Sequence, residues 1–162
     1  MLPFRFALIC FFLAATPAAA QTTNVAFGAV KADPSLPVEV TADALDVNQE
    51  DGSAEFQGNV RVSQGEMHLS AGRVKVIYSQ ETRNIQRLEA TEDVVLVSGP
   101  DAAEADRAEY SVDTGVVVMT GSVLLTQGPS ALTSDRMTVN LTTGTAQMNG
   151  RVKTILNPKG DQ

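Results

Sequence analysis

The stretch ADALDVNQEDGSAEFQGNVRVSQG, residues 42–65, decides the fold. Its apolar side chains alternate with polar ones from Leu45 to Val47 and again from Phe56 to Val62. This period of two is typical of strands that bury one face. Between the two segments, Gly52 stands where a chain reversal needs a positive φ. The stretch therefore predicts two strands joined by a turn.

The same frame recurs along the chain. Ala105-Asp106 and Ser134-Asp135 take the place of Ala42-Asp43, and each Asp is followed by two glycines at the same spacing: Gly52 and Gly58, Gly115 and Gly121, and Gly144 and Gly150. A fourth, degenerate copy runs from Ala71-Gly72 to Val97, with a longer turn at 80–87. The second glycine of each copy lies inside a strand pattern, which predicts a bulge or tight bend. The repeated Asp is expected at strand starts, where it would make turn or edge hydrogen bonds.

These repeated two-strand units divide the chain into one domain and its flanks. Residues 38–156 predict an all-β domain of eight strands or more. Residues 21–37 form an arm punctuated by prolines, and residues 157–162 form a polar tail. No helical period appears after residue 20.

The first twenty residues have the three parts of a cleavable signal peptide. Arg5 supplies the positive charge, Phe6 to Ala15 is the apolar region, and Ala18-Ala19-Ala20 is the small-residue cleavage site. We expect cleavage after Ala20 and a periplasmic location. The chain's single Cys, Cys10, would be lost with this leader, so no disulfide scaffold is expected.

Charge and side-chain chemistry narrow the function classes. The chain has 12 Lys+Arg against 19 Asp+Glu, a net charge of −7 that becomes −8 when Arg5 is removed. An acidic chain is a poor candidate for nucleic acid binding. His68 is the sole His, and alternation places it opposite the face of Met67 and Leu69. We find no catalytic constellation, no metal site and no cofactor motif, and therefore predict a protein that is not an enzyme.

The alternation instead gathers an aliphatic face that is continuous through all four units. After residue 20 only four aromatic residues remain, whereas a large closed core usually recruits more. Walls that do not meet would leave an apolar slot suited to flexible acyl chains, although an ordinary sandwich core stays open as an alternative. The predicted lipid-groove residues are Leu45, Val47, Phe56, Val60, Val62, Met67, Leu69, Val74, Val76, Tyr78, Tyr110, Val118, Val123, Met137, Val139, Met148 and Val152.

The repeated Asp, Gly and Gly-Asn-Val-x-Val elements resemble the OstA-like family of periplasmic lipopolysaccharide-transport proteins. The resemblance implies an open, twisted, V-shaped β-jellyroll that binds lipid A acyl chains inside and leaves the sugars in water. It also implies a bridge between inner and outer membranes for outer-membrane assembly, built by edge-strand stacking on LptC-like and LptD-like jellyrolls, and head-to-tail self-association. The expected edges are Pro37 to Val47 and Gln147 to Leu156.

Several alternatives remain at this point. Arg73, Lys75, Arg136, Arg151 and Lys153 either meet lipid A phosphates at the rim or are solvated outward charges. An LptC-like jellyroll would keep its N-terminal segment as a membrane anchor. A self-assembling structural β-solenoid would bind no lipid. A carbohydrate-binding or hydrolytic β protein would need an aromatic platform or paired carboxylates.

Overall fold

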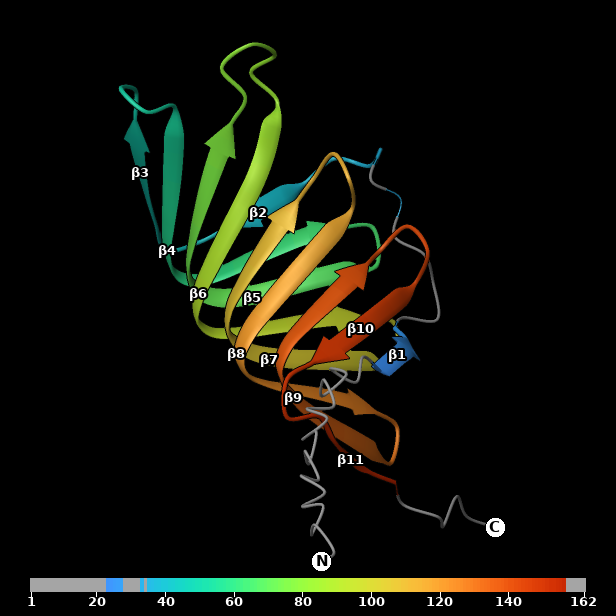
Figure 1. The fold of residues 1–162 in the computed structure, drawn as a ribbon. Coiled ribbons are helices and arrows are strands. Elements are labelled where there is room, and N and C mark those ends of the chain that lie inside the picture. The colour runs from blue at the N-terminus through green and yellow to red at the C-terminus, as the bar shows by residue number, and fades with distance from the viewer. Residues whose placement is uncertain (1–22, 28–32, 34, 157–162) are drawn as a thin grey trace, which may run out of the picture.

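The computed structural model describes residues 23–27, 33 and 35–156. The predicted leader, the C-terminal tail and part of the arm therefore lie outside the described residues. The all-β prediction is confirmed, since eleven strands form one antiparallel sheet (Figure 1). The strands are β1 Thr23–Ala26, β2 Glu39–Thr41, β3 Ala44–Asn48, β4 Ser53–Gln64, β5 Met67–Tyr78, β6 Ile85–Ser98, β7 Asp101–Ser111, β8 Val116–Gln127, β9 Ser130–Asn140, β10 Thr145–Asn149 and β11 Lys153–Ile155.

The strand order is β1-β10-β9-β8-β7-β6-β5-β4-β2, with β3 also paired to β4 and β11 also paired to β9. From β4 to β10 the order in space therefore follows the order in the chain. Gly52, Gly115 and Gly144 have φ values of 64°, 66° and 67°, which confirms their predicted place in chain reversals. Because all neighbouring pairs are antiparallel, the sheet is not the coiled stack of parallel strands that a β-solenoid requires.

A line of bulges crosses the sheet and bends each long strand. At Gly58-Asn59, Gly121-Ser122 and Gly150-Arg151 both residues have positive φ, and the pairing register shifts at the first two. The degenerate unit has the same feature at Glu92-Asp93. The predicted role of the second glycine is thus confirmed. In the neighbouring chain segment a single residue lies opposite each bulged pair: residues 43, 72, 106 and 135. We call the bulged pairs and these single residues together the bend line.

The repeated acid is part of this bend line. A Cβ atom on Gly121 would lie 2.3 Å from Asp106 Oδ2, and Asp43 and Asp135 cover Gly58 and Gly150 in the same way. In the degenerate unit the two partners are exchanged, since Glu92 covers Gly72 across the strands. Asp106 and Asp135 lie inside β7 and β9, so the expectation that they mark strand starts is wrong.

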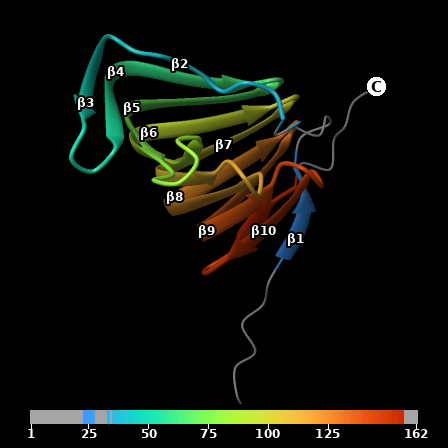
Figure 2. The same ribbon diagram turned by 90° about the horizontal axis from the view of Figure 1, so that it is seen from above.

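The bend folds the single sheet into two layers (Figure 1). Layer A contains β3, β10, β1 and the strand halves that lead to the turns at 49–52, 79–84, 112–115 and 141–144. Layer B contains β2, β11 and the halves that lead to the turns at 65–66, 99–100 and 128–129. Seen from above, β3 lies at one end of layer A and β1 at the other (Figure 2). The core lies between the layers.

Strand β1 was not expected, because the sequence predicts only an arm for residues 21–37. Its residues pair with β10, from Thr23 opposite Met148 to Ala26 opposite Thr145. Phe27 follows directly and is 1% exposed, which places it in the core. The arm therefore contributes both a strand and a core side chain.

Candidate functional site

The apolar interior between the two layers contains most of the predicted groove residues. Their side chains alternate inward along strands β4 to β10, and each is at most 4% exposed. These residues are Val60, Val62, Met67, Leu69, Val74, Val76, Tyr110, Val123, Met137, Val139 and Met148. The alternation in the sequence thus located the inner face correctly over most of its length.

Five further predicted residues lie on the same face but near its margins. Phe56, Tyr78 and Val152 are half-buried and pack against the core. Leu45 and Val47 are opposite Phe56 and Ala54 in the register of β3 and β4, yet they are 52% and 66% exposed. The reason is that β3 is an edge strand, with no neighbour on its far side to cover these side chains.

The prediction for Val118 is wrong. Val118 is half-buried and pairs with Glu109 and Thr138, whereas Val117 and Met119 are both 0% exposed and face inward. Three consecutive valines, residues 116–118, carry no alternation that could set the face. The repeat frame held the missing signal, because it aligns Met119 with Phe56 and Met148.

The interior is closed. Between β4, β5, β6, β7 and β8 the layers leave a cavity of about 10 Å³, at the lower limit of the space that one water molecule needs. Met67, Met119, Met137 and Met148 are fully buried and fill space that aromatic rings would fill in another core. The open slot expected from the shortage of aromatic residues is therefore not present in this structure, and acyl chains could enter only if the layers separated.

A buried polar bridge joins layer A to layer B at the mouth. The Tyr110 hydroxyl, on β7, donates to Gln64 Oε1 at the end of β4, and Gln64 Nε2 donates to the Leu36 carbonyl at 2.8 Å. Burial raises the pKa of Tyr110 to about 12. Because Gln64 is 1% exposed, this pair satisfies a buried amide at the mouth between the layers.

Most of the basic side chains predicted for the rim are already paired with carboxylates. Arg73 lies 3.0 Å from Glu55 and 3.5 Å from Glu92, and Lys75 lies 3.4 Å from Asp51. Arg151 lies 2.6 Å from Asp135 and, as a hydrogen-bond donor, lowers the pKa of that carboxyl. Within the described ranges, Arg136 and Lys153 have no carboxylate within 4.0 Å.

The side chains that could bind a metal ion lie apart from one another in the described residues. His68 is exposed, and its Nδ1 lies 3.4 Å from Ser63 Oγ. The part of the chain that the structure describes holds no cluster of three or more His, Cys, Asp or Glu side chains arranged for a metal ion. Nor does any helix in that part reach the length and hydropathy of a membrane span.

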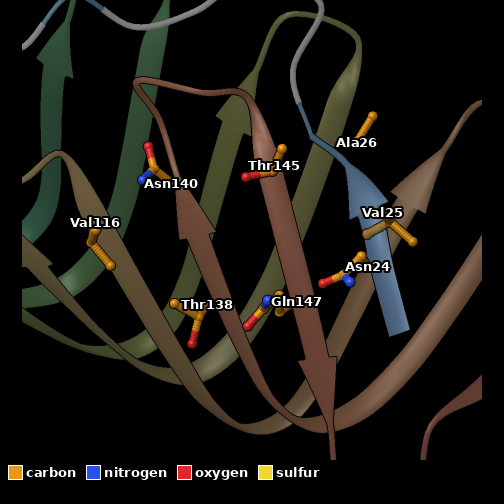
Figure 3. Close-up of a pocket in the computed structure, with 8 residues that line it drawn as sticks. All are labelled: Asn24, Val25, Ala26, Val116, Thr138, Asn140, Thr145 and Gln147. Carbon is orange, nitrogen blue, oxygen red and sulfur yellow. The ribbon is translucent and has the colours of Figure 1, made fainter. Parts of the chain in front are cut away.

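Two hollows lie at opposite ends of layer A. One, of about 650 Å³, is at the β3 end, between Val47 and Tyr78 and the turn that contains Gln80. The other, of about 640 Å³, is on the outer face beside β1 and β10 and is lined largely by polar side chains such as Asn24, Thr138 and Gln147 (Figure 3). Each hollow has one half-buried side chain that packs against the core, Tyr78 in the first and Val25 in the second. The β3 end is the more open end of the interior because Val47 is 66% exposed there, whereas Phe27 beside β1 is 1% exposed.

The exposed large apolar side chains lie at the same two ends of the folded sheet. Within the described residues they are Leu36, Leu45 and Val47 near β2 and β3, and Ile155 and Leu156 at β11. The predicted edges at Pro37 to Val47 and at β11 are therefore open edges. The prediction is wrong for β10, since β1 covers that strand.

Comparisons with known proteins give a consistent result. A family model described as "LptA/(LptD N-terminal domain) LPS transport protein" matches residues 39–145. An uncharacterized protein of Rhizobium meliloti (strain 1021) is 28% identical over 116 residues, which are 67% of this chain and 62% of that protein, so the match spans less than two thirds of the relative.

A solved structure shares the fold. The crystal structure of LptH, described as the LptA homologous periplasmic component of the lipopolysaccharide transport device from Pseudomonas aeruginosa, matches with a TM-score of 0.70. The match covers 78% of this chain and 99% of LptH at 16% sequence identity. The predicted jellyroll is thereby confirmed at the level of the fold.

Proposed function

The chain belongs to the LptA/(LptD N-terminal domain) family of LPS transport proteins, and we propose that it carries lipopolysaccharide through the periplasm with the acyl chains held between its two layers. The observation that carries this proposal is the unbroken apolar lining from Val60 on β4 to Met148 on β10. That lining has few polar groups and no charged side chain among its buried residues. It suits a ligand recognised by its hydrocarbon alone.

Hydrocarbon burial supplies the binding energy. Each CH₂ group moved from water into such a lining contributes about 0.8 kcal/mol, so acyl chains need no specific hydrogen bond to be retained. Entry requires the layers to part at their tips, with the bend line as the hinge. Contacts between the layers are then exchanged for contacts with the lipid, which keeps the cost of opening low.

The polar part of the lipid stays at the mouth or outside. A charge inside the lining would be unpaired and costly. Arg136 and Lys153 are exposed cations without a carboxylate within 4.0 Å among the described residues. Arg136 follows Asp135 of the bend line, so Lys153 on the edge strand β11 is the better candidate for a contact with phosphate groups. The paired Arg73 and Lys75 are weaker candidates for this contact.

The open edges at the ends of the sheet could join the apolar interior of this chain to that of a neighbouring chain. Edge strands with exposed apolar side chains pair readily with strands of another chain. We propose that the β2 and β3 end and the β11 end stack on LptC-like and LptD-like jellyrolls, or on further copies of this chain, so that the apolar interiors join and bridge the two membranes. The exposed Leu45 and Val47 at one end and Ile155 at the other support this proposal.

The test is to follow newly made lipopolysaccharide in cells depleted of this protein. Pulse-labelled lipopolysaccharide should remain in the inner membrane after depletion and reach the outer membrane when the wild-type gene is restored. Normal arrival at the outer membrane without the protein would refute the transport function. Depletion of an unrelated periplasmic protein provides the control for general envelope stress.

A further inference from the structure

Strand β1 pairs with β10 and so covers one of the two ends of layer A. At the opposite end, β3 leaves Leu45 and Val47 exposed, and in layer B the edge strand β11 leaves Ile155 exposed. The edge of β10 is instead paired with β1 over four residues, as Figure 3 shows for Asn24 beside Gln147. Strand β1 also lies outside the residues that match the family, 39–145.

The register of β1 on β10 copies the register inside the repeats. Val25 is opposite Ala146, as Val76 is opposite Ala54. The following residue pair repeats as well: Phe27 N donates to the Gly144 carbonyl at 3.0 Å, and Tyr78 N donates to the Gly52 carbonyl at 3.3 Å. Strand β1 therefore stands where the first strand of one more repeat would stand.

The strand that begins the first of the repeats is β3, and it is the one that lies at an open edge. In the repeat frame Leu45 and Val47 of β3 correspond to Met137 and Val139 of β9, which lie opposite Met119 and Val117 of β8. Strand β3 runs from the bend line to the tip of layer A, and β1 runs in the same direction beside β10. On β10, a β3 strand would place Leu45 opposite Met148, where β1 places Thr23.

We propose that β1 and Phe27 form a displaceable cap, and that the site beneath the cap receives β3 of a second copy of this chain. The proposal rests on the head-to-tail stacking proposed above and identifies what controls it. The cap is held by four residue pairs, by the buried Phe27 ring and by Gln127, whose Nε2 donates to the Ala26 carbonyl. Stacking at this end then requires the chain's own strand to leave.

The first experiment locks or releases the cap in the full chain, exported and purified from the periplasm. Asn24→Cys with Gln147→Cys joins two exposed, directly opposed residues by a disulfide. Val25→Asp puts a charge on the inward side of β1 and releases it, whereas Ala26→Asp, on the exposed side, is the matched control. Circular dichroism establishes that each variant keeps its sheet.

Association is then measured by light scattering over a concentration series. The oxidised lock should remain a monomer throughout, and reduction should restore the behaviour of the wild type. Val25→Asp should associate at a concentration lower by about tenfold or more, because a larger fraction of molecules has the site open. Ala26→Asp should match the wild type. Equal association of the oxidised lock and Val25→Asp would overturn the cap.

The second experiment identifies the strand that enters. One preparation carries Asp46→Cys and the other Gln147→Cys, both in the Val25→Asp chain, and the two are mixed under mild oxidation. The repeat register predicts a disulfide between positions 46 and 147 of different copies. In a parallel mixture, Asn24→Cys in the otherwise wild-type chain, where β1 stays on β10, takes the place of Gln147→Cys. A disulfide between positions 46 and 24 in that mixture would show that the second copy adds outside β1, and the proposal would fail. Lipopolysaccharide transport is measured separately in the depletion experiment above, where normal transport without the protein would count against the proposed function and not against the cap.

Discussion

On the bend line an Asp side chain covers the glycine of the bulge, as Asp106 covers Gly121. This packing predicts a loss of stability for Gly121→Ala. Gly121 has φ 83°, a conformation that costs an alanine about 1–2 kcal/mol. Its new Cβ would also lie 2.3 Å from Oδ2 and 2.9 Å from Cβ of Asp106, and relieving this overlap costs about 1–3 kcal/mol more. We expect the free energy of unfolding, measured in urea by circular dichroism, to fall by about 2–5 kcal/mol.

Gly128→Ala is the matched control for this prediction. Gly128 also has a positive φ, 53°, but nothing lies within 4 Å of the added Cβ, so only the backbone cost of about 1–2 kcal/mol applies. The double variant Asp106→Gly with Gly121→Ala puts the glycine opposite the bulge, as Gly72 lies opposite Glu92. Its loss in free energy of unfolding should be smaller than the sum of the two single losses by about 1–3 kcal/mol. Equal losses at 121 and 128, or additive effects in the double variant, would refute the reasoning.

Three other predictions test the core, the register and the leader. Tyr110→Phe should lower the free energy of unfolding by about 1–3 kcal/mol because it removes the donor to a buried amide. The wild type should also lose stability as the pH rises from 10 to about 12, because in this range the unfolded chain releases the phenolic proton first. A urea midpoint that falls as steeply with pH in Tyr110→Phe would contradict this. Val117→Asp should unfold the chain by burying an unpaired charge, whereas Val118→Asp should cost about 1 kcal/mol or less; thermal melts that reverse this order would contradict the register. N-terminal sequencing of the periplasmic protein should begin at Gln21, and a retained Met1 would favour the anchored, LptC-like alternative.

Much of the fold could be predicted from the sequence because the features that set it, the alternation of side chains and the spacing of glycines, are local. Alternation from Phe56 to Val62 set an inward face, and glycines such as Gly52 and Gly58 marked turns and bulges at fixed spacing. The role of Asp106 was misjudged because its partner, Gly121, is a neighbour only across the strands. A pattern along one strand does not show which side chain will cover a bend in the next.

The candidate site was predictable where polar residues interrupt the apolar ones. Val118 was misplaced because its valine neighbours remove that interruption. Strand β1 was missed because four residues, Thr23 to Ala26, carry little periodicity, and their pairing with β10 joins segments more than a hundred positions apart. The closed interior likewise depends on how four methionines pack, which composition alone does not fix.

The central claim is that acyl chains lie between the two layers, and site-specific photo-crosslinking in vivo tests it most directly. A photoreactive amino acid at Val76 or Met148 faces the interior, while the adjacent Lys75 and Gln147 face outward on the same strands and serve as controls. We predict lipopolysaccharide adducts at Val76 and Met148 and none at Lys75 and Gln147. Adducts at the outward positions without adducts at the inward ones would contradict the account.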